Sequence, residues 1–142
     1  MEKKTIIPVT LVLLMKQNKV LLQRRCNTGF HDGLYSFPGG HIKLGETPIN
    51  AAVREAGEET GVRLDLAYLE LVHVMYLRDQ DELIAFFFKT ERMSGQPKIM
   101  ESSKCSDLAW FDTSQLPKDT APHIRQAMDC ILQKKLYSEY EY

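Results

Sequence analysis

The sequence predicts one mixed α/β domain, and three observations carry that prediction. First, the chain has 142 residues, of which 44% are hydrophobic and 26% are charged, the size and balance of a single globular domain over 1–142. Second, most of its apolar segments are short, as strands are, and polar turns separate them. Third, two longer segments, 48–60 and 121–135, are predicted to be helices. Strands, a helix, more strands and a second helix indicate helices packed on a mixed sheet.

The first strand is predicted from an almost continuous apolar run. Residues 9–15 read as a strand that is covered on both faces. The polar residues 17–19 can turn the chain, and 20–22 then return as the second half of a hairpin. Residues 27–45 contain glycines at 29, 33, 39, 40 and 45, which predicts a loop. Later strands are predicted over 68–77, 83–89 and 108–111.

Both ends of the chain need separate interpretation. Lys3 and Lys4 precede the apolar residues 6–15, an arrangement that loosely mimics a signal peptide. Pro8 interrupts the run, no small-residue cleavage site follows, and the run is too short to cross a bilayer as a helix. We therefore expect a buried strand there and no membrane partner. For the aromatic tail 137–142 three alternatives stay open: docking on the domain, docking on a second subunit of a homodimer, or fraying.

Charge and cysteine content limit the partners and the compartment. Lys and Arg total 18 and Asp and Glu total 19, so the net charge is −1 and no binding of duplex nucleic acid is expected. None of the cysteines lies in a C-x-x-C pair, and three cannot form a closed set of disulfides. Free thiols predict a reducing compartment, the cytoplasm. These cysteines are Cys26, Cys105 and Cys130.

The helix over 48–60 has clear signals at both ends. Thr47 is a good N-cap, and Pro48 suits the first helical position, where its missing N–H group would have no partner anyway. Gly61 can adopt the left-handed conformation that ends many helices. Helical spacing places an apolar face on one side, predicted to meet the core, and charged residues on the other. The predicted core face consists of Ile49, Val53, Ala56 and Thr60.

The charged face of this helix is unusually acidic. Glu55, Glu58 and Glu59 share it with a single arginine, Arg54, and Glu46 lies just upstream. Like charges at these spacings destabilise a helix, and glutamates near its C-terminal end oppose its dipole. A divalent cation would relieve the repulsion, and carboxylate oxygens favour Mg²⁺ or Mn²⁺ over zinc. The alternative is a solvated acidic surface in which Arg54 pairs with Glu58.

The pattern around this helix resembles the Nudix box. Gly40 and Glu46 precede the segment 54–62, which reads REAGEETGV, and only Ala56 is smaller than the family's usual residue. The segments 21–25, 36–41 and 109–117 resemble the family's neighbouring strand, the loop before the box and a late strand with its turn, so the resemblance covers about 5–135. It implies an α/β/α sandwich around a mixed β-sheet, with the box as a loop–helix–loop motif.

The resemblance also implies roles for individual residues. Glu55, Glu58 and Glu59 are the expected ligands of Mg²⁺, or of Mn²⁺, together with the carbonyl group of Gly40. Arg54 is expected to orient Glu55. Glu46 is expected to support the metal ligands without binding the metal itself. In addition, Gly39 and Gly40 are expected to let the backbone approach the metal or the substrate phosphates closely.

Two assignments have open alternatives. The general base is Glu58 or Glu101, which lies on the loop before the late strand. Arg24 and Arg25 are candidates for binding substrate phosphate, and because strand residues alternate, we expect only one of them to face the site. The histidines show no metal-ligand spacing and are interpreted as structural; they are His31, His41, His73 and His123.

The implied activity is Mg²⁺-dependent hydrolysis of a nucleoside diphosphate linked to another group. The sequence favours a small, MutT-like enzyme that converts a nucleoside triphosphate to the monophosphate and pyrophosphate. Residues 49–96 contain no proline, whereas ADP-ribose hydrolases resemble one another in a proline some distance after the box. A nucleotide-sugar or dinucleotide pyrophosphatase is the alternative enzyme, and a non-catalytic nucleotide-binding module is the alternative of another class.

Overall fold

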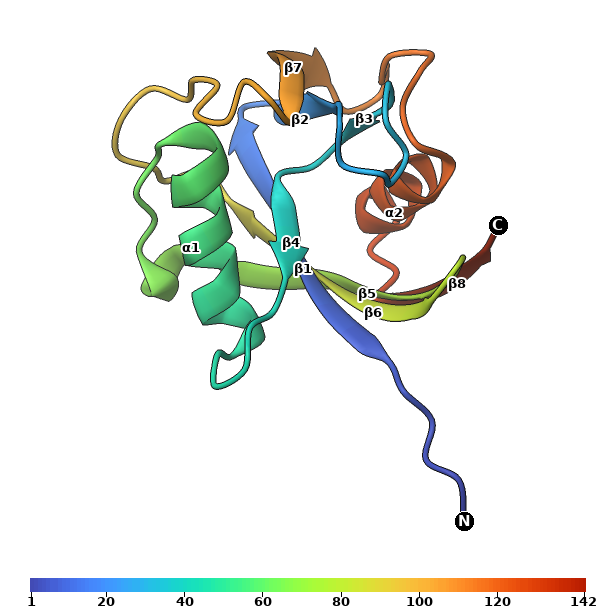
Figure 1. The fold of residues 1–142 in the computed structure, drawn as a ribbon. Helices are drawn as coiled ribbons and strands as arrows, with labels where there is room; N and C mark the ends of the chain where they lie inside the picture. The colour runs from blue at the N-terminus through green and yellow to red at the C-terminus, as the bar shows by residue number, and fades with distance from the viewer.

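The computed structural model describes all residues from Met1 to Tyr142 and shows a mixed sheet between two helices (Figure 1). Its strands are β1 (Ile7–Lys16), β2 (Lys19–Arg25), β3 (Tyr35–Ser36), β4 (Gly39–His41), β5 (Glu70–Arg78), β6 (Glu82–Thr90), β7 (Cys105–Asp112) and β8 (Tyr137–Glu141). Its helices are α1 (Pro48–Thr60), a short 3₁₀ turn η1 (Leu66–Tyr68) and α2 (Pro122–Leu132). The predicted α/β/α sandwich is confirmed.

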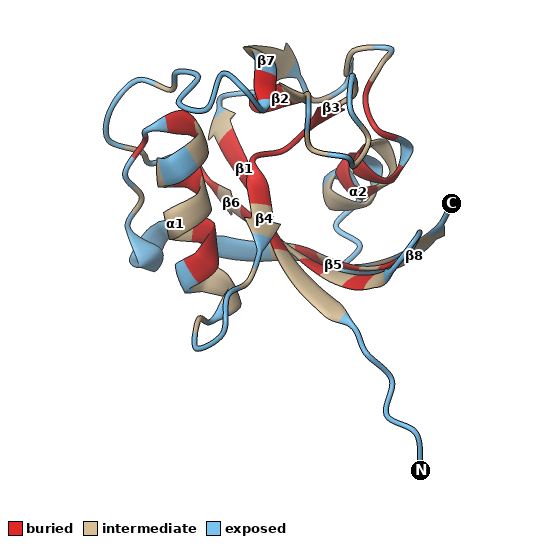
Figure 2. Cartoon of the chain, viewed as in Figure 1, coloured by how far each residue is buried: buried red, intermediate tan, exposed pale blue.

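Strand β1 is the centre of the sheet. It runs parallel to β6 and antiparallel to β2 and β4, and the sheet continues from β6 to β5 and β8. Its side chains alternate between two cores: Leu13 packs in the cluster that includes α2, and Val12 and Leu14 pack in the cluster under α1. Burial on both faces explains why this strand is almost continuously apolar (Figure 2).

Helix α1 begins and ends as the sequence predicts. The Thr47 side chain accepts a hydrogen bond from the backbone N–H of Asn50, and Gly61 adopts a left-handed conformation with φ of 78°. The buried face differs in part from the predicted one: Ala51 and Ala52 are fully buried, whereas Val53 is only half-buried. Small side chains at the contact let the helix lie close to the sheet, which the helical period alone does not reveal.

The loop predicted over 27–45 contains two short strands. Strand β4 pairs with β1, with Gly39 opposite Leu11 and Gly40 opposite Thr10. A Cβ atom on Gly39 would lie 2.1 Å from the backbone oxygen of Thr10, so only glycine permits this approach. Strand β4 therefore places the segment before α1 directly beside the central strand.

The aromatic tail docks on the domain. Residues 137–141 form β8, which pairs in parallel with β5 at the edge of the sheet. Elsewhere the elements differ from the prediction mainly at their ends, since α2 stops at Leu132 and β5 starts at Glu70. No helix of the structure has both the length and the apolar character needed to cross a membrane.

Two glycines of the α1 region should respond oppositely to alanine. A Cβ atom on Gly57 would meet only the backbone oxygen of Val62, at 3.6 Å, so Gly57→Ala should stabilise the fold by about 0.5–1 kcal/mol because alanine is the better helix former. Gly61→Ala should destabilise it, since that residue has positive φ. Urea unfolding of both variants measures the change, and a lower midpoint for Gly57→Ala would contradict this account of the helix.

Candidate active site

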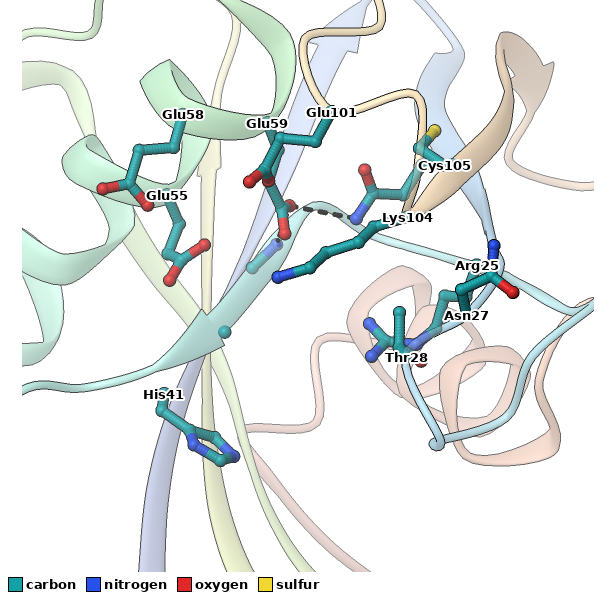
Figure 3. A pocket seen from close by; sticks show the side chains of 13 residues that line it. Arg25, Asn27, Thr28, His41, Glu55, Glu58, Glu59, Glu101, Lys104 and Cys105 are labelled. Carbon is teal, nitrogen blue, oxygen red and sulfur yellow. Dashed lines mark hydrogen bonds between the residues drawn. The ribbon is translucent and has the colours of Figure 1, made fainter.

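A charged pocket of about 360 Å³ lies between α1, the end of β2, strand β4 and the loop before β7 (Figure 3). Apart from two glycines and Cys105, polar and charged residues line it. Carboxylates stand on the α1 side and basic side chains stand opposite them (Figure 3). The lining residues are Gln23, Arg25, Asn27, Thr28, Gly39, Gly40, His41, Glu55, Glu58, Glu59, Glu101, Lys104 and Cys105.

Arg54 links three of the acidic side chains. Its guanidinium donates to Glu46 at 2.6 and 2.9 Å, to Glu55 at 2.9 Å and to Glu58 at 3.0 Å. A further donor reaches the backbone oxygen of His41 at 3.0 Å, which fixes the guanidinium to β4. These hydrogen bonds raise the pKa of Arg54 and lower the pKa of Glu46 to about 2. Two of the four pocket glutamates, Glu55 and Glu58, are thus held in fixed orientations by Arg54.

Glu59 is held differently, by neutral donors. Its carboxylate accepts hydrogen bonds from the backbone N–H of Gly39 at 2.8 Å and from the side-chain amide of Gln23 at 2.9 Å. Burial raises the pKa of Glu59 to about 7, and the charge of Glu55 adds to that rise. Burial also raises the pKa of Glu55. The two carboxylates, Glu55 and Glu59, are close together and shielded from water, which destabilises the fold when no counterion is present. The same arrangement favours the binding of a cation.

The donor chemistry of this pocket fits Mg²⁺ or Mn²⁺. Glu55, Glu58 and Glu59 offer hard oxygen ligands, and Glu55 lies directly against the backbone of Gly40, where a Cβ atom would come within 2.6 Å of its carboxylate oxygen. In this conformation no three acidic, histidine or cysteine side chains converge into a closed metal site. A cation here would complete its shell with water, a backbone carbonyl or phosphate oxygens, as Mg²⁺ commonly does.

Only one of the two candidate arginines faces the pocket. Arg25 lines it, and its guanidinium donates to the backbone oxygen of Phe30 at 2.7 Å. Arg24 lies outside the pocket: its guanidinium forms an ion pair with Asp119 and lies over the ring of Tyr35, 4.7 Å from the ring centre. The structure therefore places Arg24 away from the position expected for a phosphate ligand, because neighbouring strand residues point to opposite faces.

The loop before β7 brings Glu101 and Lys104 to the pocket. The backbone oxygen of Glu101 accepts hydrogen bonds from the N–H groups of Lys104 and Cys105 at 2.9 and 3.0 Å, which form a tight turn. The side chain of Asn27 donates to the backbone oxygen of Ser103 at 3.0 Å and ties this turn to the loop after β2. The charge of Glu101 also contributes to the raised pKa of Glu55.

Several lining residues escaped the sequence prediction. Gln23 could have been found, since it lies two residues before Arg25 on the same face of β2. Lys104 carries no comparable signal in the sequence. The predicted residues Glu55, Glu58, Glu59 and Glu101 all lie at this pocket, with Arg54 behind them.

A second cavity of about 350 Å³ adjoins the charged pocket and is more apolar. The two share Arg25, Thr28, Gly39, Gly40 and His41 as a common border. Side chains of β1, β5 and β6 form most of its apolar floor, and one aromatic ring comes from the loop after β2. Its polar members come from β3, the β5–β6 turn and α2. These lining residues are Ile7, Val9, Leu11, Phe30, Leu77, Leu83 and Ala85, with Ser36, Gln80, Asp81 and His123 as polar members.

The comparisons with known proteins agree with this architecture. A model of the NUDIX domain matches residues 4–130. The chain belongs to the Nudix hydrolase family. The ADP-ribose pyrophosphatase of Methanocaldococcus jannaschii is 34% identical over 78% of this chain and 64% of that protein's length. The 8-oxo-dGTP diphosphatase of Escherichia coli is 31% identical over 80% of this chain and 88% of its own.

Solved structures show the same fold. The crystal structure of a MutT Nudix hydrolase from Burkholderia pseudomallei superimposes with a TM-score of 0.82 at 23% identity, covering 89% of this chain and 98% of that one. A MutT protein from Methanosarcina mazei also reaches 0.82 at 19% identity, with 94% and 98% of the two chains covered. The family resemblance and the fold class predicted from the Nudix box are thereby confirmed.

Replacing Gly40 by alanine should displace Glu55 without unfolding the domain. The new Cβ atom would lie 2.6 Å from a carboxylate oxygen at the end of a flexible side chain, so the carboxylate moves and the backbone does not. We expect an unfolding temperature close to that of the unmodified protein and a smaller rise of that temperature when Mg²⁺ or Mn²⁺ is added. Gly57→Ala, in the same box, is the matched control and should keep the full response to metal.

His123 should make the domain less stable in acid. Burial, together with the nearby charges of His31 and Arg25, lowers its pKa from 6.5 to about 3. Between those values the unfolded chain binds a proton that the folded chain does not, so stability falls as the pH drops below about 6.5.

Urea unfolding at pH 7.5 and 5.5 tests this expectation. His123→Gln should lose about 1 kcal/mol less on acidification than the unmodified protein does. His41→Gln, at an exposed histidine, is the control and should show the unmodified protein's loss. Equal losses in all three proteins would contradict the buried, neutral state of His123.

Proposed function

We propose that this protein hydrolyses the diphosphate linkage of a nucleotide, and that its preferred substrate is a nucleoside triphosphate, cleaved to the monophosphate and pyrophosphate. One observation carries the proposal: a pocket with three box glutamates on one side and two basic side chains on the other opens into an apolar cavity. Such a site accommodates a polyanion joined to an organic group.

The number of organic groups favours a triphosphate. The apolar cavity of about 350 Å³ suits one nucleoside, and the adjoining pocket, lined by charged and polar groups, suits phosphates. ADP-ribose or a nucleotide sugar would place a second organic group in the charged pocket. The relatives named above act, by their names, on ADP-ribose and on 8-oxo-dGTP, which share a diphosphate linkage. A nucleotide-sugar or dinucleotide pyrophosphatase is therefore the competing assignment.

The side chains divide the work between charge and positioning. Arg25 and Lys104 neutralise substrate phosphates from the side opposite the carboxylates. Glu55, Glu58 and Glu59 hold Mg²⁺ or Mn²⁺, and the Gly40 carbonyl group completes their set. When bound, the cation offsets the charge of the phosphates and lowers the pKa of a coordinated water molecule.

Arg54 acts as a positioning residue for hydrolysis. It fixes Glu55 and Glu58 through the hydrogen bonds described above and anchors them to Glu46. A water oxygen forms the new bond to phosphorus while the bond to the leaving phosphate oxygen breaks. The proton released by the water passes to Glu58 or Glu101, the two acids at the pocket that remain candidates for the general base.

The cellular compartment proposed for the enzyme rests on its cysteines. Cys26, Cys105 and Cys130 are free in the structure, which supports a reducing compartment, the cytoplasm. The proposed partner is a small nucleotide substrate. We propose no membrane partner and no duplex nucleic acid partner. A homodimer stays a prediction.

The first experiment is a substrate panel. Release of phosphate and pyrophosphate is followed for nucleoside triphosphates, nucleotide sugars and dinucleotides, with Mg²⁺ and with a chelator. Chelator-sensitive cleavage of triphosphates supports the proposal, and cleavage of another class alone supports the competing assignment. Equilibrium binding of nucleotides without cleavage would instead identify a non-catalytic nucleotide-binding module.

Substitution of the box glutamates gives a sharper result. Glu58→Gln should lower kcat on the preferred substrate by roughly 100-fold or more while the unfolding midpoint stays close to that of the unmodified protein. Glu70→Gln, at an exposed glutamate on β5, is the control and should be fully active. An unchanged rate in Glu58→Gln would remove Glu58 from the site.

A parallel pH profile separates the two candidate bases. The general base must be deprotonated before it can accept a proton from water, so kcat should rise with pH on the acid side of the profile. Replacing the base by glutamine should remove that rise in kcat. We expect that change in only one of Glu58→Gln and Glu101→Gln.

A further inference from the structure

Four side chains from distant segments meet beside the apolar cavity. They are His31 from the loop after β2, Asp79 from the β5–β6 turn, His123 from the first turn of α2, and Tyr142, which follows β8. His31 Nε2 lies 2.9 Å from the Asp79 carboxylate, and the rings of His31 and Tyr142 lie 4.5 Å apart. The hydroxyl oxygen of Tyr142 lies 2.5 Å from Nδ1 of His123 and accepts a hydrogen bond from its backbone N–H at 3.2 Å.

The same segments form the walls of the apolar cavity. Phe30, beside His31, lines one wall; Gln80 and Asp81, next to Asp79, line a second; and His123 itself lines a third. The rings of Phe30 and His31 pack edge to face, with centres 4.2 Å apart. The contacts among the four side chains therefore connect three walls that the backbone joins only through long stretches of chain.

Tyr142 reaches this position because β8 continues the sheet. Strand β8 pairs in parallel with β5, and the backbone N–H of Tyr142 donates to the oxygen of Arg78 at 3.0 Å. The end of the chain consequently lies beside the turn that carries Asp79 and close to α2 (Figure 1). Tyr142 is 44% exposed as a residue, so it lies at the outer side of the group and does not belong to the core.

The backbone of His31 gives an independent indication that these contacts hold a particular conformation. Its φ of 50° lies in the left-handed region, which is uncommon for residues other than glycine. Such a conformation persists when surrounding contacts enforce it, and here Asp79 and Tyr142 contact the side chain from two separate segments. Phe30, the residue before His31, lines the cavity wall.

We propose that Tyr142 is a positioning residue that, through His123 and His31, sets the shape of the apolar cavity and thereby the affinity for the organic part of the substrate. This inference rests on the proposed function, in which that cavity holds the nucleoside. None of the four side chains lies at the charged pocket, and the box glutamates lie on α1. Loss of Tyr142 therefore affects nucleoside binding and leaves cleavage at saturation unchanged.

Tyr142→Ala tests the proposal with Tyr137→Ala as the matched control. Tyr137 is the first residue of β8 and Tyr142 follows its last, and they are similarly exposed, at 54% and 44% respectively. The hydroxyl group of Tyr137, however, bonds only to Glu139 on its own strand. Calorimetry measures the binding of a nucleoside monophosphate and of inorganic pyrophosphate, and steady-state assays give kcat and KM. We expect Tyr142→Ala to weaken monophosphate binding and raise KM by roughly tenfold, with pyrophosphate binding and kcat within about twofold. Tyr137→Ala should resemble the unmodified protein.

Tyr142→Phe covers the possibility that the alanine variant does not fold. It keeps the ring against His31, loses the hydroxyl contact with His123, and should weaken monophosphate binding by a smaller factor. Unchanged monophosphate affinity in folded Tyr142→Ala or Tyr142→Phe, or an equal loss of pyrophosphate binding, would overturn the proposal.

These outcomes are distinct from failure of the proposed function. Binding that depends on Tyr142 in a protein that cleaves nothing would support the positioning role and contradict the activity. Cleavage of nucleotides by a protein whose nucleoside affinity does not depend on Tyr142 would support the proposed activity and contradict the positioning role.

Discussion

The close approach of β4 to the central strand is the constraint on which the site depends. At Gly39 the two backbones lie too near for any side chain, and the N–H group of the same residue donates to the carboxylate of Glu59. One residue later, Gly40 leaves space only for the carboxylate of Glu55. Two successive glycines thus join the sheet to the acidic face of α1, and the rest of the box is arranged around that junction.

The electrostatics of the box favour ligand binding over stability. Arg54 compensates Glu46, Glu55 and Glu58 through several hydrogen bonds, whereas the hydrogen bonds to Glu59 come from neutral donors and burial raises its pKa to about 7. Carboxylates held close together and away from water are unfavourable without a counterion. The two faces of the sheet have different tasks as a result: the α1 side concentrates charge, and the other side offers an apolar cavity bordered by α2.

The edge strand β8 links sheet stability to the shape of that cavity. It adds backbone hydrogen bonds at the margin of the sheet and brings Tyr142 against His123 and His31. Edge strands are commonly the least stable part of a sheet, since only one neighbour holds them. A cavity supported from such an edge can adapt to its ligand without disturbing the carboxylates on α1, because none of those carboxylates lines the cavity.

The sequence by itself determined the parts of this protein that depend on local rules. Thr47, Pro48 and Gly61 set the ends of α1 through capping and backbone preference, and the spacing from Gly40 to Val62 identified the family and its candidate metal ligands. The alternation of strand residues correctly predicted that only one of Arg24 and Arg25 faces the pocket, although it did not say which.

Only the tertiary structure decided the contacts between distant segments. It placed Ala51 and Ala52 in the core in place of Val53, docked the tail as β8, and brought Lys104 opposite the carboxylates of α1. It also assembled the group around Tyr142 from four segments that no spacing in the sequence relates. The physical reason is that capping and periodicity act within a few residues, whereas pairing register and side-chain packing depend on where the whole chain folds.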